Sequence, residues 1–495
     1  MKFILAIDQG TTGTTAALIN SETLEFVDKV NKEFPQIYPS PGLVEHNLND
    51  IWDTVKYTIK TLLSKNNINR SNILSIGITN QRETTCAFND DGEALTNAIV
   101  WQDKRTSDFC QSLKSNEDMV KTKTGLPIDP YFSATKINWF LTHIQSVKDA
   151  LSEGNLKFGT IDTFLLFKLS GNKSFKTEPS NASRTLLMDL KKTDWDDELL
   201  NLFEVPRSTL PTITDSFADF GITEGLSFLP DGIPITGILG DQQSALFGQA
   251  GHEKGSIKCT YGTGSFMLLN IGNEIQYSKN GLLTTVAYQH KGKAVYALEG
   301  SCFIAGAAVQ WIRDNLNFIK DSSEIESLAN SISSLDSVKN ILFLPFFSGL
   351  GSPHWIPDGK AAIIGLSRDS GKAEISHACL EGIALSINDL LNAMRVDSGV
   401  NIDEIRVDGG AVVNDLLMNL QATFSGCKVI RPSVIETTAY GAALAAAIGS
   451  NTLKFEDISK LWKEDKCFEP SSNLMAYTTS KSKLWDSFIN KLYIK

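Results

Sequence analysis

The first part of the chain alternates short apolar runs with polar turns. Residues 3–10 and 15–20 are apolar segments joined by a turn rich in glycine and threonine, and residues 73–79 form a third apolar segment. Short apolar runs bounded by turn residues predict buried β-strands, so we expect strands there and at residues 97–103. Residues 49–63 have apolar positions at helical spacing, which predicts a helix capped by Asn49 or Asp50.

The second part of the chain repeats this pattern. Residues 232–250 predict a strand, a turn at Asp241 and a helix, and residues 255–271 form another strand–turn–strand unit with a glycine- and threonine-rich turn. Helical spacing follows at residues 304–316 and 375–394, and residues 405–421 predict a strand, a turn and a helix. This alternation of strands and helices predicts an α/β fold.

The two hairpins divide the chain into two similar halves. The change from one half to the other lies near residues 247–254, so we expect an N-terminal domain at residues 1–247 and a C-terminal domain at residues 248–495. A length of 495 residues allows two large domains. Because no long linker separates the halves, we expect them to pack together with a cleft between them.

The composition narrows the class of protein. Apolar residues make up 42% and charged residues 21%, and the net charge of −11 comes without a basic run. A general nucleic-acid-binding protein is disfavoured, because a phosphate backbone needs clustered lysine and arginine. The seven cysteines form no Cys-x-x-Cys pair, and no segment has the length of a secretion signal or a membrane span. We therefore expect a cytoplasmic protein with reduced thiols.

The two hairpin turns, residues 8–15 and 261–265, are candidates for phosphate binding. Glycine and threonine leave backbone N–H groups accessible and add hydroxyls, which suits a phosphate group. Each turn alone is equally compatible with a plain hairpin, but two of them favour a nucleoside triphosphate. Neither the P-loop sequence nor the protein-kinase loops occur in the chain. A third glycine-rich turn at residues 407–411 is a weaker candidate.

Polar side chains follow two of the predicted strands. Arg82 and Glu83 come after the predicted strand at residues 73–79. Asp241 stands at the end of the predicted strand that begins at residue 232. The carboxyl ends of strands in an open α/β sheet are where ligands bind. Arg82 and Glu83 could bind hydroxyl groups or form only a surface salt bridge. Asp241 could accept a proton from a substrate hydroxyl, cap the next helix, or do both.

Two aromatic residues and the histidines are the remaining residues considered for a role in the site. Trp101 and Phe266 flank candidate loops, and each is either a core residue or part of an apolar wall against the carbons of a polyol. The six histidines have no metal-binding spacing, so we assign them no catalytic role.

Eleven segments, in order along nearly the whole chain, resemble the polyol branch of the FGGY family of carbohydrate kinases. These segments are DQGTT at 8–12, NQRETT at 80–85, AIVWQDKRT at 98–106, GLPIDPYFSATK at 125–136, PSNASRTLL at 179–187, GDQQSALFGQ at 240–249, TYGTGSFML at 260–268, ALEG at 297–300, AVQWIRD at 308–314, SGLGSPHW at 348–355 and RVDGGAVVND at 406–415.

The resemblance implies the fold shared by actin, sugar kinases and the heat-shock chaperone ATPase: two ribonuclease H-like domains of related topology, with ATP and substrate in the cleft. It implies phosphoryl transfer from Mg-ATP to glycerol, giving sn-glycerol 3-phosphate and ADP, with Asp241 as the general base. It also implies a homodimer or homotetramer.

The resemblance also assigns binding residues. Asp8 would hold Mg²⁺ through water. The polyol-binding positions would be Arg82, Glu83, Tyr131, Asp241 and Gln242, with Trp101 and Phe266 as the apolar wall. The nucleotide-binding positions would be Thr11, Thr12, Gly13, Thr263, Gly306, Gln310, Gly410 and Asn414.

The chain departs from the family pattern in the first turn. Where members commonly have two serines and an arginine, it has Gly13, Thr14 and Thr15, so a positive charge near the nucleotide phosphates is missing. Residues 227–231 lack the glycine- and arginine-rich pattern that binds fructose 1,6-bisphosphate in some bacterial members. Residues 217–225 contain no histidine for phosphotransfer regulation.

Two alternatives to glycerol phosphorylation stay open. The first is a kinase of the same family that acts on another short polyol or a ketose. The second is a non-catalytic, ATP-gated binding protein on the same fold. The acid at Asp241, the Arg82–Glu83 pair and the absence of an appended peptide-binding segment argue against the second alternative.

Replacing Thr15 by arginine should restore the missing charge. We expect Thr15→Arg to lower the KM for ATP, most strongly at low ionic strength, because salt screens the attraction between a cation and phosphate. Initial rates against ATP concentration at low and high salt test this. An unchanged or higher KM would mean that another residue already supplies the charge.

Overall fold

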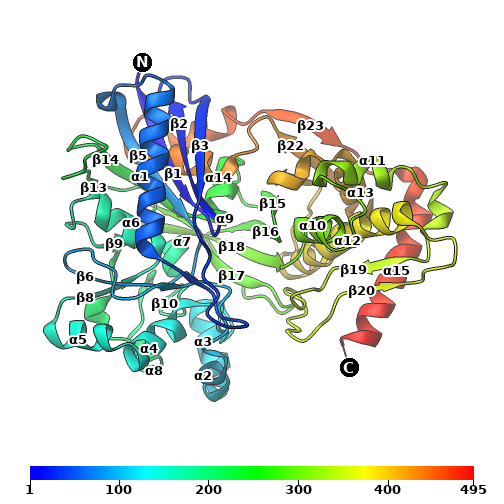
Figure 1. The fold of residues 1–495 in the computed structure, drawn as a ribbon, viewed down its shortest axis with the longest axis horizontal. Coiled ribbons are helices and arrows are strands. Elements are labelled where there is room, and N and C mark those ends of the chain that lie inside the picture. The colour runs from blue at the N-terminus through cyan, green and yellow to red at the C-terminus, as the bar shows by residue number, and fades with distance from the viewer. Residues whose placement is uncertain (495) are drawn as a thin grey trace.

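The computed structural model describes residues 1–494 and contains two large β-sheets, one in each half of the chain (Figure 1). The first has the strand order β13-β14-β5-β1-β2-β3 and consists of β1 (Phe3–Gln9), β2 (Gly13–Asn20), β3 (Phe26–Glu33), β5 (Ile73–Asn80), β13 (Gly221–Ile222) and β14 (Pro234–Gly240). The second has the order β17-β18-β16-β15-β21-β22-β23 and consists of β15 (Ile257–Tyr261), β16 (Ser265–Gly272), β17 (Leu283–His290), β18 (Lys293–Cys302), β21 (Glu404–Asp408), β22 (Lys428–Pro432) and β23 (Glu464–Phe468).

The central strands of the two sheets have the same topology. β1 and β2 form an antiparallel hairpin, β3 adds antiparallel to β2, and β5 and β14 continue the sheet in parallel on the other side of β1. In the second sheet β15 and β16 form the hairpin, β18 adds antiparallel to β16, and β21 and β22 continue in parallel beside β15. This repeat confirms the α/β fold and the two related halves predicted from the hairpins.

Helices cover the sheets, and a smaller lobe extends the first domain. Next to the first sheet lie α1 (Leu48–Lys65), α6 (Ile161–Leu169), α9 (Asp241–Gly248) and α14 (Thr437–Gly449). The second domain contains α10 (Gly306–Asp314), α11 (Ile325–Ala329), α12 (Lys372–Ser398), α13 (Asp415–Ser425) and α15 (Met475–Leu492). The lobe, at the lower left of Figure 1, contains α2 (Ser107–Ser112), α3 (Glu117–Thr124), α4 (Ser133–His143), α5 (Gln145–Glu153) and α8 (Asp197–Leu202).

The short elements link these layers. The short strands are β4 (Glu45–His46), β6 (Cys86–Asn89), β7 (Ala98–Ile99), β8 (Leu156–Gly159), β9 (Lys176–Thr177), β10 (Met188–Asp189), β11 (Asp194–Trp195), β12 (Thr212–Ile213), β19 (Leu342–Leu344) and β20 (Ala362–Ile364), and α7 (Pro179–Ala182) is a single helical turn.

The helix α14 comes from the C-terminal half of the sequence but packs on the first sheet. A Cβ atom at Gly77 of β5 would lie 2.0 Å from the backbone oxygen of Ala442, and one at Gly237 of β14 would lie 2.3 Å from the backbone nitrogen of Ala446. Two glycines therefore let the helix backbone approach the sheet closely. The division at residues 247 and 248 stays a prediction, and the packing of α14 joins the two halves across it.

Three element boundaries differ from the sequence predictions. The first helix begins at Leu48, and its cap is Asn47, whose side chain accepts the N–H of Asn49 at 2.8 Å, so the predicted cap was wrong. Of residues 97–103, only β7 is a strand, because the chain then turns to bond Val44 through the Val100 N–H and the Asp103 carboxylate. The helix predicted at residues 304–316 is shorter and forms α10.

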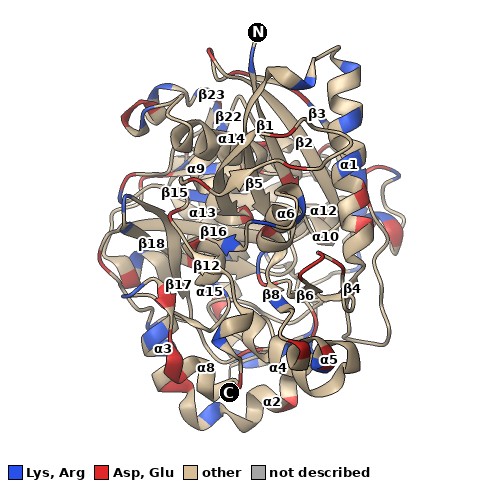
Figure 2. Ribbon diagram, turned by 90° about the vertical axis from the view of Figure 1, so that its left-hand side faces the viewer, with Lys and Arg blue, Asp and Glu red and all other residues tan. Residues whose placement is uncertain are grey.

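In the described part of the chain, the charged residues form no single acidic or basic region, and the cysteines form no disulfide. Figure 2 shows acidic and basic residues interspersed over both domains. All seven cysteines are free, and five of them are buried. Within residues 1–494, no helix combines the length and the apolar character that crossing a bilayer would require.

A side chain at Gly77 should separate α14 from the first sheet. We expect Gly77→Ala to lower the free energy of unfolding by about 3 kcal/mol, because the added methyl meets backbone atoms that have no room to move. Denaturant unfolding measures this. Gly154→Ala is the control, because nothing lies within 4 Å of the added Cβ there and only the strain of its positive φ of 75° remains. Equal losses in both variants would contradict the packing argument.

Candidate active site

Five charged side chains of alternating sign form a buried chain, here called the ion ladder, between the two sheets. Arg82 and Glu83 follow β5, Asp241 begins α9, Arg184 follows α7, and Glu299 comes from β18. Four of them are at most 2% exposed, and Asp241 is 26% exposed, so only this end of the ladder meets solvent. The ladder therefore ends in a partly accessible carboxylate.

The contacts of the ladder are close and directional. Nε of Arg82 lies 3.1 Å from Oδ1 of Asp241, and its two Nη atoms donate to both carboxylate oxygens of Glu299 at 2.5 and 3.0 Å. Arg184 continues the ladder, with Nη2 3.1 Å from Oε1 of Glu299 and Nε donating to Oε1 of Glu83 at 2.5 Å. Bidentate pairing of this kind fixes the plane of the guanidinium group.

Burial and the neighbouring charges act against each other in the ladder. Burial alone would raise the pKa of Glu299, but Arg184 and Arg82 hold that pKa below its usual range. For Glu83 burial outweighs the attraction to Arg184 and Arg82, so its pKa is raised. The backbone of Glu83 has a positive φ of 60°, and its carbonyl accepts the hydroxyl of Ser133 at 2.9 Å. The sequence alternative of a surface Arg82–Glu83 salt bridge is thus wrong, because both residues are buried and each pairs with more distant partners.

Three aromatic rings form a cluster that contacts the ladder through Tyr131 and Arg184. Trp101 is edge-on to Tyr131 at a centroid distance of 5.5 Å and to Phe266 at 6.3 Å. Tyr131 also lies beneath the guanidinium of Arg184, 5.4 Å from its ring centroid. Three rings from separate parts of the chain thus form an apolar cluster of the kind that packs against the carbons of a small polyol.

The first glycine- and threonine-rich turn is held in place from three sides. Trp101 donates its indole N–H to Oγ1 of Thr11 at 3.0 Å, and the amide of Gln36 donates to the carbonyl of Thr11 at 3.1 Å. Gln36 is held in turn by His46 at 2.8 Å. Thr12 is exposed, whereas Gly13 is buried against β3. A Cβ atom at position 13 would lie only 2.9 Å from the backbone oxygen of Lys32. Gly13 is therefore required by the contact with β3.

Asp8 lies beside this turn in a carboxylate-rich environment. Burial, together with the charges of Asp241 and Glu436, raises its pKa to about 8, and Lys29 acts in the opposite direction. Carboxylate oxygens are the ligands that Mg²⁺ prefers, and Mg²⁺ usually binds one or two of them while keeping several waters. Within residues 1–494 no group of three or more His, Cys, Asp or Glu side chains is arranged to hold a metal ion, and the role of Asp8 stays a prediction.

Lys29 brings a positive charge close to the position where Thr15 stands. Asp8 pairs with Thr15 across β1 and β2, and Thr15 pairs with Asn31 across β2 and β3, with Asn31 donating to its hydroxyl at 2.9 Å. Lys29 lies two residues from Asn31 and hence on the same face of β3. Its ammonium pairs with Glu436, at the start of α14.

The second turn opens into a cavity of about 470 Å³ in the C-terminal domain. It is lined by five of the predicted nucleotide-binding residues: Thr263, Gly306, Gln310, Gly410 and Asn414. The N–H of Gly306, at the start of α10, donates to the carbonyl of Gly262 at 3.0 Å, which ties the turn to the helix N-terminus. A volume of this size accommodates a nucleoside.

Close backbone approach explains the third glycine-rich turn. Gly409 has a φ of 91°, and a Cβ atom there would lie 2.6 Å from the carbonyl oxygen of Tyr261, so β21 and β15 can end side by side only with glycine. Asn414 caps α13 by accepting the N–H of Leu417 at 2.8 Å. The turn thus forms part of the wall of the nucleotide-sized cavity.

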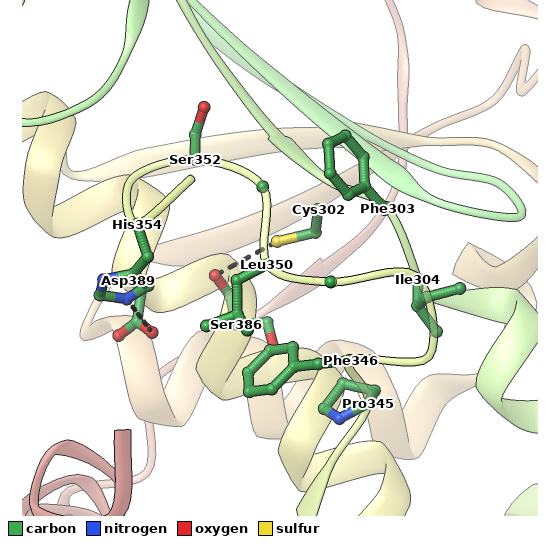
Figure 3. A pocket seen from close by; sticks show the side chains of 12 residues that line it. Cys302, Phe303, Ile304, Pro345, Phe346, Leu350, Ser352, His354, Ser386 and Asp389 are labelled. Atoms are coloured by element: carbon green, nitrogen blue, oxygen red, sulfur yellow. Dashed lines mark hydrogen bonds and ion pairs between the residues drawn. The ribbon is translucent and has the colours of Figure 1, made fainter. Parts of the chain in front are cut away.

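A smaller cavity of about 20 Å³ lies in the same domain, with Ile304 among its lining residues (Figure 3). Cys302, Ser386, His354 and Asp389 are among its lining residues, with Nε2 of His354 3.7 Å from Oδ2 of Asp389. It has room for about one water molecule. None of the predicted site residues is among its lining residues, whereas five of them line the larger cavity.

Several residues of the site carried no assigned role in the sequence analysis. Arg184 and Glu299 lie in segments that matched the family pattern, but their partners are 101 and 217 residues away. The available signal was the carboxylate of Glu299 in the otherwise apolar run of β18, since an unpaired buried charge is costly. His46 also acts structurally, by holding Gln36 beneath the first turn.

Two sheets of equal topology, each ending in a glycine- and threonine-rich turn, define a sugar-kinase-type phosphotransferase of the actin-like ATPase class. Family models described as the N-terminal and C-terminal domains of the FGGY family of carbohydrate kinases match residues 3–248 and 257–450. The chain belongs to the FGGY family of carbohydrate kinases.

Individual relatives agree with this placement. The chain is 49% identical over 472 residues to a glycerol kinase of Bdellovibrio bacteriovorus, covering 94% of each protein. A crystal structure of Plasmodium falciparum glycerol kinase with ADP superimposes with a TM-score of 0.91 at 33% identity, covering 100% of this chain and 99% of that one. A xylulose kinase of Lactobacillus acidophilus has a TM-score of 0.87 at 21% identity, covering 99% of this chain and 98% of that one, and shares the fold.

Lys29 should contribute to ATP binding in place of a charge at position 15. We expect Lys29→Met to raise the KM for ATP about fivefold at low salt, because a half-exposed charge contributes about 1 kcal/mol, and to do so less at high salt. Steady-state kinetics provide the measurement. Lys32→Met, on the opposite face of β3, is the matched control and should leave the KM unchanged. If both variants behave alike, Lys29 has no special role.

Proposed function

We propose that this protein phosphorylates glycerol with Mg-ATP to give sn-glycerol 3-phosphate and ADP. The observation that carries the proposal is the partly exposed Asp241 carboxylate, which Arg82 holds at the accessible end of the ion ladder. The cluster of Trp101, Tyr131 and Phe266 would supply the apolar wall for the carbons of glycerol. The near full-length similarity to a glycerol kinase supports the choice of substrate. ATP supplies the phosphoryl group, and the ADP-bound relative supports a nucleotide in the larger cavity.

Asp241 acts as the general base. Its Oδ1 is held by Arg82 and by the N–H of Gln242 at 2.7 Å, which leaves Oδ2 to accept the proton of a terminal hydroxyl as its oxygen attacks the γ-phosphorus. Asp241 is also the first residue of α9, where the partial positive charge of the helix N-terminus stabilises a carboxylate. Arg82 and Glu83 would bind the remaining hydroxyls, the first as donor and the second as acceptor.

The turns at both sheet ends hold the phosphates. The first turn, around Thr11 and Thr12, would bind the transferring phosphoryl group, and Thr263 with Gly306, Gln310, Gly410 and Asn414 would bind the rest of the nucleotide. Asp8 would hold Mg²⁺, which when bound neutralises charge on the phosphates, where most of the catalysis of phosphoryl transfer lies. Closure of the two domains would exclude water as a competing acceptor.

Assembly and location complete the proposal. We expect a homodimer or homotetramer in the cytoplasm, where ATP is available to a kinase. Light scattering on the purified protein gives the number of subunits.

The choice among substrates is settled by one assay. ADP release should be fastest, by kcat/KM, with glycerol when glycerol, dihydroxyacetone, erythritol, xylulose and gluconate are compared. A higher kcat/KM for xylulose or gluconate would move the protein to another branch of the family. ATP binding without ADP release on any acceptor would favour the binding-protein alternative.

Removing the general base should abolish turnover but not binding. We expect Asp241→Asn to lower kcat by about 10²–10⁴-fold, the usual contribution of a general base, while the isothermal titration signal for ADP stays the same. Asp53→Asn, on the solvent face of α1 with a 66% exposed side chain, is the matched control. Near wild-type turnover of Asp241→Asn would require a different base.

A further inference from the structure

Lys258 on β15 is a buried cation without an ion pair. Its side chain is fully inaccessible, yet within residues 1–494 no carboxylate lies within ion-pair distance of its ammonium. Lys481, which is equally buried, differs because it pairs with Glu381 at 2.8 Å. A buried charge that only neutral acceptors satisfy is costly, so its place beside the active site calls for a functional reason.

The ammonium of Lys258 uses all three of its donors. It donates to Oε1 of Gln242 at 2.5 Å, to Oγ1 of Thr260 at 2.8 Å and to the carbonyl oxygen of Phe266 at 3.4 Å. These acceptors come from α9, from the strand that leads into the second turn and from the opposite strand of that hairpin. Lys258 thus joins the substrate side of the first domain to the phosphate-binding hairpin of the second.

The contact with Lys258 fixes which way the amide of Gln242 points. An ammonium only donates hydrogen bonds, so the Gln242 atom that faces it must be the carbonyl oxygen. The NH₂ group of that amide is then directed away from Lys258. Within residues 1–494 Lys258 is the only hydrogen-bond partner of the Gln242 side chain. Gln242 follows Asp241 directly, so its NH₂ is available as a donor beside the general base.

Charges at longer range keep the ammonium in this environment. Burial lowers the pKa of Lys258, and the positive charge of Arg82 lowers it further. Three groups act in the opposite direction: Asp408 on β21, the Cys259 thiol and Asp241 on α9. The two aspartates therefore compensate part of the burial of the cation without contacting it.

We propose that Lys258 is a positioning residue that acts through Gln242: it holds the amide with its NH₂ group turned toward a hydroxyl oxygen of the acceptor, and it ties that amide to the hairpin carrying Thr263 and Phe266. This inference rests on the proposed phosphorylation of a polyol. According to this proposal, a lysine that solvent does not reach helps the site to select an acceptor that carries a hydroxyl group.

Kinetics of Lys258→Met test the inference. We expect the KM for glycerol to rise and kcat/KM for glycerol to fall about 10- to 100-fold, because the donor to the acceptor hydroxyl loses its orientation. The KM for ATP should change less than about twofold, because the nucleotide cavity has no contact with Lys258. Equal changes in both KM values would indicate general damage to the site and would overturn the inference.

A double-mutant cycle with Gln242→Ala separates positioning from a merely structural role. If Lys258 acts through Gln242, adding Lys258→Met to Gln242→Ala should lower kcat/KM less than about threefold further. The same loss in both backgrounds would overturn the inference. Lys258→Gln, which keeps a neutral donor, replaces Lys258→Met in the cycle if the methionine variant does not fold.

The wild-type assay distinguishes a failure of this inference from a failure of the proposed function. Wild-type ADP release that depends on glycerol, with additive effects in the cycle, rejects the role of Lys258 alone. If another acceptor in the panel is preferred, the cycle is measured with that acceptor, and non-additivity still supports the inference. If no acceptor stimulates ADP release, both the proposed function and this inference fall.

Discussion

The buried ion ladder is the constraint on which the rest of the site depends. Leaving one partner of a buried ion pair without the other costs about 3–5 kcal/mol, so Arg82, Glu299 and Arg184 are stable only together. Because Glu299 comes from the second sheet and the two arginines from the first domain, the ladder requires the sheets to meet at one separation and angle. The orientation of Asp241, at the accessible end, follows from its pairing with Arg82 together with the N–H of Gln242 in its own helix.

The repeated topology places corresponding features of the two domains at corresponding edges of their sheets. In each domain the hairpin turn and the ends of the following parallel strands lie at the same edge of the sheet, because the topology is the same. Packing α14 of the C-terminal half against the first sheet brings the two edges together, and the glycines at 77 and 237 allow that contact. Backbone packing on one side and ion pairing on the other thus hold the two domains, so substrate and nucleotide can bind to different domains yet react.

The sequence predicted the framework better than the partners of individual side chains. The hairpins, the strand and helix around Asp241 and the long helix α12 were predictable, because hydrophobic periodicity and turn residues are local signals. Residues 97–103 look like a strand but are mostly a loop, since the side chain of Asp103 holds a distant backbone N–H of Val44. The partners of Arg82 were not predictable, because Glu299 lies 217 residues away. Its carboxylate stands out in the apolar run of β18, but nothing local indicates which cation it pairs with.

The first turn shows how register can move a charge from one strand to the next. The sequence suggests a missing cation at Thr15, because a family pattern compares positions one at a time. In the sheet, the relevant neighbourhood is two-dimensional: Asp8, Thr15 and Asn31 lie in one row across three strands, and Lys29 projects from the same face two residues away. The charge of Lys29 reaches Asp8, as its effect on the pKa of that carboxyl indicates. Its partner Glu436 stands at the start of the helix that packs on the first sheet, so the same ammonium also takes part in the contact between the two halves of the chain. A comparison of positions along one strand therefore misses a charge that the neighbouring strand brings to the same face of the sheet.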